Sequence, residues 1–164
     1  MVTLFDPAHA NDRDACKQAF QNAGLIVADR HIEGEPNAVT QVFFTDGPGE
    51  DPLWYRLATL VYMGGTLTGQ AMATPLVPAS LGCTVLHGPN LTPNRPVYEP
   101  LIQAQATVSV GHGRKLGTAI ATTLAPDAAA ATAQAAWDIT TAGAEATDEI
   151  IEYLCDRLSL TFMD

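Results

Sequence analysis

Short apolar runs alternate with amphipathic helical segments along the first two thirds of the chain. The runs typical of strands are residues 2–5, 25–28, 40–44, 60–63, 84–87 and 107–110. Strands that alternate with helices in this way indicate a parallel sheet with helical crossovers. The pattern therefore predicts an α/β, Rossmann-like fold with a mostly parallel sheet and helices on both faces. Since nothing along the chain resembles an interdomain boundary, we expect one domain over residues 1–164.

Two helices between these strands have recognisable ends and apolar faces. After the first strand, Asn11 or Asp12 can cap a helix that Gly24 ends. Its expected inner face consists of Cys16, Ala19, Phe20 and Ala23. Pro52 suits the first turn of a second helix. The expected inner face of that helix consists of Leu53, Trp54 and Leu57.

From Lys115 onward the sequence becomes rich in alanine and helical in pattern, and Pro126 starts a new helix. One apolar stripe consists of Ala128, Ala131, Ala135 and Ile139, and a second consists of Ile150, Ile151, Leu154 and Leu158. Apolar residues three and four positions apart share one helix face. We therefore expect two or three helices that close the domain.

The charge balance limits the possible partners. The chain has 8 Lys and Arg against 18 Asp and Glu, a formal net charge of −10. Nucleic acids and anionic membranes are bound through clustered positive charge, so neither is an expected partner. A phosphate-bearing ligand would have to rely on backbone N–H groups and helix N-termini.

The sequence also favours a cytoplasmic protein, since it shows neither a secretory signal nor an apolar run long enough to span a membrane. Its cysteines, Cys16, Cys83 and Cys155, have no CxxC spacing. We expect them to be reduced and mostly buried thiols.

Common catalytic and cofactor motifs do not occur. The histidines at positions 9, 31, 87 and 112 form no HExxH or paired spacing, so we predict no metal site. GxSxG, GxGxxG and P-loop motifs are likewise missing. We therefore predict no catalytic residue and no cofactor.

What remains is a set of loops rich in Gly and Pro at the predicted carboxyl ends of the strands, where open α/β sheets bind ligands. They are residues 6–9 (Asp-Pro-Ala-His), 46–50 (Asp-Gly-Pro-Gly-Glu), 64–67 (Gly-Gly-Thr-Leu), 74–78 (Thr-Pro-Leu-Val-Pro) and 87–90 (His-Gly-Pro-Asn). A Gly-Gly pair permits close backbone approach to a ligand, but alone it is only a turn signal.

Taken in order, these loops resemble the C-terminal, donor-binding domain of the 3-deoxy-D-manno-octulosonic acid (Kdo) transferases. These are two-domain glycosyltransferases of lipopolysaccharide synthesis that use CMP-Kdo. The resemblance extends over nearly the whole chain. In the first part of the chain, Pro7 and His9 match a Pro-Arg-His element, Asp46, Gly49 and Glu50 match Asp-x-x-Gly-Glu, and Leu53, Trp54 and Tyr55 fit the next helix. Further on, residues 64–67 match Gly-Gly-Ser-Leu, and Gly88 and Pro89 match Gly-Pro-His. The element Asn-Pro-Leu-Glu-Pro-Ala-x-x-Gly is matched by Pro75, Leu76, Pro78, Ala79, Leu81 and Gly82.

The resemblance implies a site for CMP or CMP-Kdo. The residues it assigns to that site are His9, Gly49, Glu50, Gly64, Gly65, Thr66, Thr74, Gly88 and Pro89. Plainer roles stay open for some of these positions. Glu50 could instead stabilise a helix N-terminus, and His9 and His87 could be hydrogen-bonded at the base of a loop. Trp54 and Tyr55 could be packing residues.

Three positions depart from the family pattern. Ala8 stands where the family has Arg, and Thr74 and Val77 stand where it has Asn and Glu. A carboxylate at position 77 would suit the hydroxyls of a donor ribose, and Val77 cannot replace it. Each lost charge-assisted hydrogen bond costs about 1.5–3 kcal/mol, which weakens affinity roughly tenfold to a hundredfold.

The resemblance also implies two missing pieces. The family's general base and acceptor-binding surface lie on an N-terminal domain that this sequence lacks. Its C-terminal domain also begins with a further strand and helix, which carry an Ala-Ser-Thr-His element. The first strand of a doubly wound sheet is central, so its absence would leave an unpaired edge or a gap. We expect the sheet to rearrange or a second chain to cover the edge, most simply in a homodimer.

Three functions are therefore open. The chain could be a degenerate donor domain that is not catalytic alone and serves as a binding or interaction module. It could be the nucleotide-sugar-binding half of a split Kdo transferase, with the N-terminal half on another polypeptide. It could also be an unrelated doubly wound domain that binds another nucleotide or a small acid.

Overall fold

The computed structural model describes residues 1–7, 10–47, 49–70, 73–92, 94–142 and 144–158. The chain divides into two compact units, Met1–Ala58 (unit 1) and Thr59–Asp164 (unit 2), and each is described by itself. All six predicted strands are present, each within two residues of its expected bounds. They pair in parallel in two three-stranded sheets, which confirms the expected α/β, Rossmann-like class. That the whole chain is one domain stays a prediction.

Unit 1 contains a parallel sheet in the order β1-β3-β2. Its elements are β1 (Thr3–Phe5), η1 (Ala10–Asp12), α1 (Arg13–Asn22), β2 (Val27–Asp29), α2 (Arg30–Glu33), β3 (Val42–Phe44) and α3 (Asp51–Leu57). The central strand β3 is fully buried, and its Phe43 lies opposite Leu4 on one side and Ala28 on the other.

Helices cover both faces of this sheet. Successive side chains of a strand point to opposite faces. Phe43 packs edge-on against Trp54 of α3, with 5.6 Å between the ring centroids. Phe44, on the other face, packs against Phe20 of α1 at 6.0 Å. The two helices therefore lie on opposite sides of β3.

Two expectations about the inner faces of these helices are only partly right. In α1, Cys16 and Phe20 are half-buried as expected, but the side chains of Ala19 and Ala23 are exposed. Their expected places on the inner face are taken by Arg13 and Lys17, because both cations reach the buried Asp29. In α3 only Trp54 is buried, while Leu53 and Leu57 are 46% and 68% exposed.

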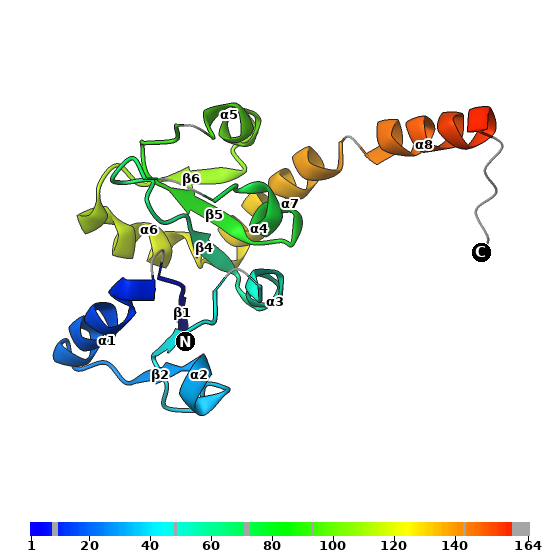
Figure 1. Cartoon of the computed structure of the whole chain (residues 1–164). Coiled ribbons are helices and arrows are strands. Elements are labelled where there is room, and N and C mark those ends of the chain that lie inside the picture. The colour runs from blue at the N-terminus through cyan, green and yellow to red at the C-terminus, as the bar shows by residue number, and fades with distance from the viewer. Residues whose placement is uncertain (8–9, 48, 71–72, 93, 143, 159–164) are drawn as a thin grey trace. The chain divides into compact units, whose positions relative to one another are not determined.

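Unit 2 contains a second parallel sheet in the order β4-β5-β6, with β5 in the middle (Figure 1). Its elements are β4 (Leu60–Tyr62), α4 (Leu76–Ser80), β5 (Thr84–His87), α5 (Arg95–Gln103), β6 (Thr107–Ser109), η2 (Gly113–Lys115), α6 (Leu116–Thr123), α7 (Pro126–Thr141) and α8 (Ala144–Leu158). Every residue of β5 is buried. Its neighbours pair in register, Val61 with Val85 and Leu86 with Val108.

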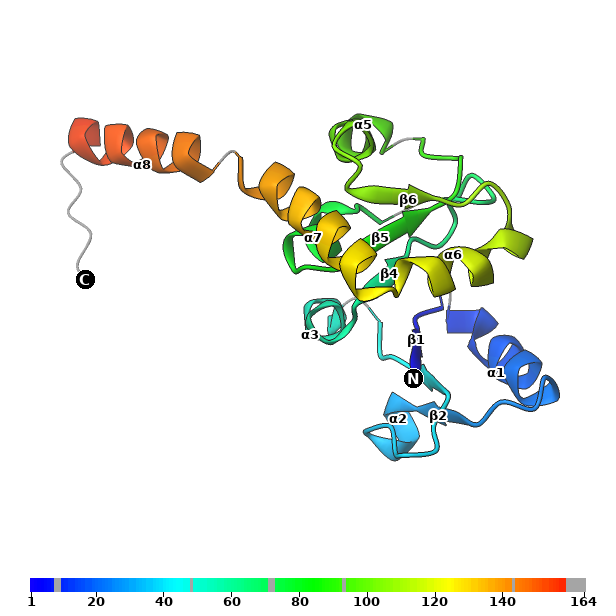
Figure 2. The ribbon, with the colours of Figure 1, turned by 180° about the vertical axis from the view of Figure 1, so that it is seen from behind.

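The core of unit 2 lies where α4, α5 and α7 pack beside the sheet (Figure 2). Its buried members are Met63, Ala79, Val85, Leu91, Tyr98, Leu101, Ala106 and Ala136. Burial raises the pKa of the Cys83 thiol to about 11. Cys83 is buried as expected, whereas Cys16 and Cys155 are only half-buried. The three cysteines form no disulfide.

The expected C-terminal helices are present as α6, α7 and α8, but their faces differ from the prediction. In α7 the buried position is Ala136, with Ala135 and Ile139 packed beside it, whereas Ala128 and Ala131 are exposed. In α8 the stripe of Ile150, Ile151 and Leu154 exists but is 44–59% exposed. The side chain of Leu158 lies outside the described residues.

Candidate functional site

Two of the loops predicted in unit 2, residues 64–67 and 87–90, lie at one edge of its sheet, together with a segment after β6 that was not predicted. Three segments follow the carboxyl ends of β4, β5 and β6: residues 64–69, residues 88–90 and residues 110–115. We call them the carboxyl-edge loops. Because carboxyl ends of parallel strands meet at a common edge, this is the ordinary ligand-binding position of an open α/β sheet.

Thr66 and Gly88 fasten the first two loops together. The fully buried Thr66 hydroxyl donates to the carbonyl of Met63 at 2.6 Å and accepts from the backbone N–H of Gly88 at 2.7 Å. A Cβ at position 88 would lie 2.3 Å from the Thr66 carbonyl oxygen. Only glycine therefore fits at this crossing. Both residues were expected at a donor site, and the structure uses them to hold its loops in place.

Asn90 adds a second fastening between the same loops. Its backbone N–H donates to the Thr66 carbonyl at 2.9 Å, and its side-chain amide donates to the Leu67 carbonyl at 2.8 Å. Sequence reasoning did not single out Asn90, which stands where the family pattern has histidine. A donor amide after Gly88 and Pro89 is the signal that could have indicated this role.

Gly64, Gly65 and Pro89 form the accessible part of this junction. Gly64 and Pro89 are exposed, and Gly65 is half-buried. Gly65 has φ +79°, in the left-handed region that favours glycine, and its carbonyl accepts the N–H groups of the following turn. Within the described residues, the N–H groups of Gly64 and Gly65 reach no backbone carbonyl. Such N–H groups can bind an anionic ligand.

His87 is hydrogen-bonded at the base of the loop, which is the alternative role that the sequence left open for it. Its ring is 3% exposed. Nδ1 lies 2.7 Å from the Gly88 carbonyl oxygen, and Nε2 lies 3.2 Å from the Thr107 hydroxyl. The ring also contacts Tyr98 edge-on, with centroids 5.2 Å apart. Both ring nitrogens are therefore engaged within unit 2.

Thr74 and Val77 lie at the start of α4. The Thr74 hydroxyl accepts from the N–H of Leu76 at 3.4 Å. Val77 is 41% exposed, as is its neighbour Leu76. The position at which the resemblance expects a carboxylate is thus an accessible apolar side chain. It offers no hydrogen-bond acceptor.

Gly49 and Glu50 belong to unit 1, and His9 lies outside the described residues. Gly49 is exposed. Glu50 pairs with Arg30, with 2.9 Å between Oε1 and the guanidinium, and Arg30 also lies over the Trp54 ring. The hydrogen bond from Arg30 holds the pKa of Glu50 below its ordinary value. Glu50 precedes α3, so the alternative role at a helix N-terminus fits its position.

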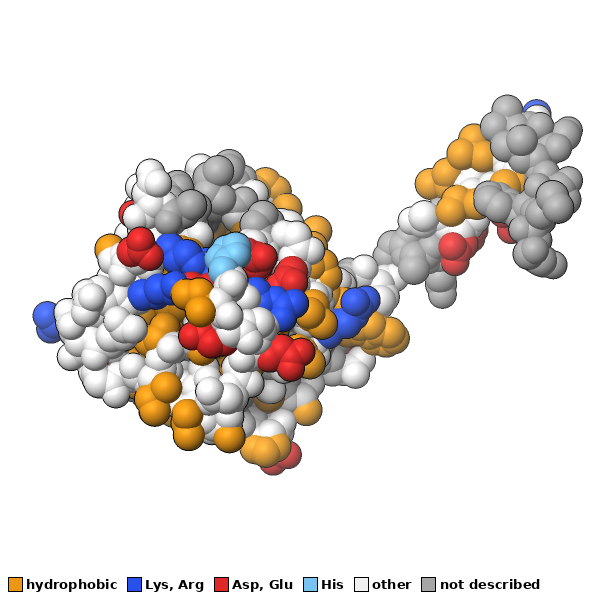
Figure 3. Space-filling model, turned by 60° about the horizontal axis from the view of Figure 1, so that its bottom comes forward, with side chains coloured by type: hydrophobic (Ala, Val, Ile, Leu, Met, Phe, Trp, Pro, Cys, Tyr) orange, Lys and Arg blue, Asp and Glu red, His pale blue; other side chains and the backbone are white. Residues whose placement is uncertain are grey.

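Unit 1 has a charged network that sequence reasoning missed. Asp29, at the end of β2, is 3% exposed and accepts from the Arg13 guanidinium at 2.9 and 3.1 Å, and Lys17 also contacts it. Nearby, His31 Nε2 lies 2.8 Å from Asp46. Figure 3 shows acidic and basic side chains interleaved around a histidine on this face. Aspartates directly after strands were the available signal.

Opposing effects set the pKa of Asp29. Burial alone would raise it, but hydrogen bonds from Arg13, Lys17 and the His31 N–H outweigh burial and hold the pKa well below its ordinary value of 3.8. At Asp6, burial outweighs the attraction of Arg13 and raises the pKa. The network is therefore an internally neutralised ion cluster with little charge left for a ligand.

Two further observations concern metals and membranes. Within the described ranges, no group of three or more His, Cys, Asp or Glu side chains is placed to share a metal ion. In the same part of the chain, every helix is too short or too polar to cross a bilayer.

Comparison with known proteins relates the chain to a solved structure. No protein-family model matches the chain. Among solved structures, the chain is similar to the C-terminal CMP-Kdo binding domain of WaaA from Acinetobacter baumannii. The TM-score is 0.74 at 25% sequence identity, and the alignment covers 82% of this chain and 71% of the other. The resemblance found in the sequence is thereby confirmed, and the chain has the fold of a Kdo transferase-like donor domain.

Proposed function

We propose that the chain is a donor-type domain that binds CMP, or a CMP-sugar such as CMP-Kdo, and is not catalytic alone. The observation that carries the proposal is the Thr66–Gly88 crossing, which fastens two glycine loops at the carboxyl edge of a parallel sheet. The likeness to a CMP-Kdo binding domain supports the choice of nucleotide.

In this proposal the ligand phosphate meets backbone N–H groups rather than the hydroxyl of Thr66. That hydroxyl already joins the carbonyl of Met63 to the N–H of Gly88, and it is fully buried. Thr66 therefore acts as a positioning residue. Gly64 and Gly65 supply N–H donors, and Pro89 lies exposed beside them. Backbone donors of this kind bind phosphates in glycine-rich loops.

In this proposal the site has lost polar contacts to the part of the donor beyond the phosphate. The Thr74 hydroxyl accepts from the N–H of Leu76, and Val77 offers the ribose no acceptor. Missing charge-assisted hydrogen bonds weaken binding by about tenfold or more each. We therefore expect affinity for CMP in the micromolar to low millimolar range. A cytoplasmic location and a role as a binding or interaction module go with this proposal.

A second candidate is the donor half of a split Kdo transferase in lipopolysaccharide (lipid A) synthesis. An acceptor hydroxyl of lipid A would attack the anomeric carbon of the donor sugar, with the general base on a separate N-terminal half. The stripe of Ile150, Ile151 and Leu154 favours this candidate, because a partner polypeptide needs an apolar surface to bind. Copurification with such a half, and transfer activity only in the mixture, would distinguish it from the degenerate domain.

The direct test is calorimetric titration with CMP, using UMP as control. Selective CMP binding supports the proposal. Equal affinity for both nucleotides points to a doubly wound domain with another ligand. No heat at several millimolar of either nucleotide contradicts the proposal.

A gain-of-function variant sharpens the test. Val77→Glu restores a carboxylate at the start of α4 and should tighten CMP binding by about tenfold. Leu76→Glu is the matched control, because it adds the same charge at a neighbouring position with the same 41% exposure. Tightening by both variants, or by neither, would contradict the assigned role of position 77.

A further inference from the structure

Two adjacent cations in unit 2 stand out in a chain with a net charge of −10. Arg114 and Lys115 are both exposed, and within the described residues no carboxylate lies within ion-pair distance of either. The other basic residues of unit 2 are engaged. Arg95 pairs with Glu99 at 3.4 Å, and the Arg157 guanidinium lies over the Tyr153 ring.

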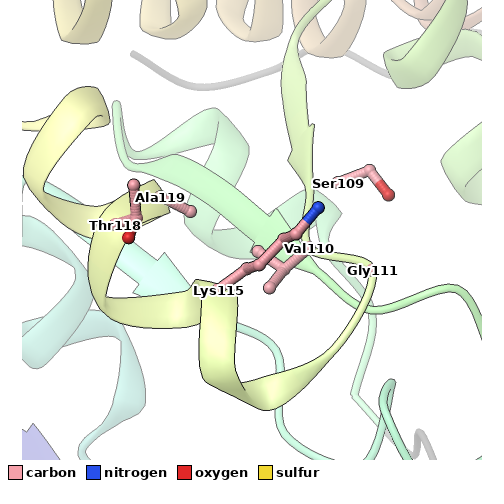
Figure 4. A pocket seen from close by; sticks show the side chains of 6 residues that line it. All are labelled: Ser109, Val110, Gly111, Lys115, Thr118 and Ala119. Atoms are coloured by element: carbon pink, nitrogen blue, oxygen red, sulfur yellow. The ribbon is translucent and has the colours of Figure 1, made fainter.

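These two cations line shallow depressions at the carboxyl end of β6. Arg114 borders one depression together with His112 and Gly113. Lys115 borders a second one, whose other lining residues are Ser109, Val110, Gly111, Thr118 and Ala119. Figure 4 shows the Lys115 side chain extended across this second depression. The pair therefore lies in a hollowed part of the surface.

The basic segment is continuous with the loops of the proposed donor site. The N–H of Val110 donates to the His87 carbonyl at 2.7 Å, directly before Gly88. A Cβ at Gly113 would lie 3.8 Å from Leu67 Cδ1, within the first carboxyl-edge loop. Both contacts lie inside unit 2, so the cations and the Gly64–Gly65 backbone share one edge of the same sheet.

We propose that Arg114 and Lys115 form an anion-binding subsite that takes the phosphate of the bound nucleotide. This rests on the proposed function and deepens it by assigning the charged part of the ligand. Cations without an ion-pair partner attract a phosphate, and guanidinium and ammonium groups form the stronger, charge-assisted hydrogen bonds. The backbone N–H groups of Gly64 and Gly65 lie at the same edge of the sheet.

The test compares two double variants with equal loss of charge. Arg114→Gln/Lys115→Gln removes the subsite, and Arg95→Gln/Arg157→Gln removes two cations elsewhere in unit 2. Calorimetry gives the Kd for CMP, for cytidine, for inorganic phosphate and for free Kdo. Circular dichroism and the thermal midpoint check that both variants fold. We expect the Kd for CMP to rise about tenfold or more in the first variant only, with cytidine binding unchanged.

The probes separate failure of the subsite from failure of the proposed function. If wild type binds CMP and the first variant binds it equally well, the subsite is wrong and the proposed function stands. If wild type ignores CMP but binds phosphate, and only the first variant loses phosphate binding, the subsite stands and the proposed function is wrong. If the first variant loses binding of free Kdo but keeps binding of CMP, the two cations bind the carboxylate of the sugar. That result would overturn the assignment of the phosphate to them. If wild type binds none of the anions at several millimolar, both are wrong.

Discussion

At position 88 the backbone passes so close to residue 66 that a single added carbon decides stability. The Cβ of an alanine would lie 2.3 Å from the Thr66 carbonyl oxygen, and backbone atoms cannot give way as a flexible side chain can. We predict that Gly88→Ala lowers the free energy of unfolding by about 1–3 kcal/mol, the usual cost of overpacking. Urea denaturation followed by circular dichroism measures this.

Gly64→Ala is the matched control, because a Cβ there meets nothing within 4 Å. It should change stability by no more than about 0.5 kcal/mol. Equal effects of the two substitutions would mean that the Thr66–Gly88 crossing does not form as described.

Asp29 gives unit 1 a stability that depends on pH. Two cations neutralise this buried carboxylate, and removing its charge leaves Arg13 and Lys17 without their partner. We predict that Asp29→Asn lowers the free energy of unfolding at pH 7 by about 3 kcal/mol. Asp14→Asn, an exposed change on α1, the helix that carries Arg13 and Lys17, should have almost no effect.

The sign of the pH dependence follows from the lowered pKa of Asp29 in the folded chain. A carboxyl group with a depressed folded pKa contributes stability that is complete above about pH 5 and is lost as the pH falls. Stability of the wild type measured from pH 7 to pH 3 should therefore fall more steeply than that of Asp29→Asn. Parallel curves would contradict the assigned ion cluster.

At the residue level, the positions of the loops could be predicted from the sequence better than the roles of single residues within them. Gly64, Gly65 and Gly88 could be placed after the strands β4 and β5 because glycine loops after strands are local signals. The roles of Thr66 and Asn90 could not be predicted, because their hydrogen-bond partners Gly88 and Leu67 lie 22 and 23 positions away in the chain. Asp29 was missed since its partners lie 12 and 16 positions earlier in the chain.

Among the elements, strands were predicted better than helix faces. Buried strands are short, apolar and bounded by turn residues, so all six could be read from the sequence. In α7, alanine on every side gives little contrast between faces, and the buried position is Ala136 rather than the predicted stripe. In α1, the inward position of Lys17 follows from Asp29, which no helical pattern reveals.

Helix α5 allows a test of packing on a single element. Leu101 is fully buried in the core of unit 2, whereas the next residue, Ile102, is 39% exposed. We predict that Leu101→Ala lowers the free energy of unfolding by about 2–5 kcal/mol, through lost burial and the cavity it leaves. Ile102→Ala should cost less than about 1 kcal/mol. Similar losses in urea denaturation would show that α5 presents another face to the core.

At the scale of the whole molecule, the pairing of strands was beyond sequence reasoning. The six strands were expected in one sheet, yet the described strands form two sheets of three. Which strands pair depends on contacts between distant segments, and no local pattern encodes it.

The outer strands lead to a prediction about assembly. Each of them pairs on one side only among the described strands, and an open strand edge is a template for a second chain. We predict a homodimer formed through such an edge. Light scattering after size exclusion should give twice the mass of the chain over a dilution series.

The exposed stripe of α8 provides the control for that experiment. Ile150→Glu/Leu154→Glu removes the stripe and should leave the dimer intact. A monomeric wild type would contradict the predicted assembly. A variant that alone becomes monomeric would assign the dimer to α8 instead of a sheet edge.

The central claim is that the carboxyl-edge loops of unit 2 bind a CMP-type ligand. The most direct measurement is an NMR titration of the ¹⁵N-labelled chain with CMP, followed through the backbone amide shifts. We predict saturable shifts that are largest at Gly64, Gly65, Arg114 and Lys115, with UMP causing smaller ones. Shifts confined to residues 1–58, or no shift at several millimolar CMP, would contradict the claim.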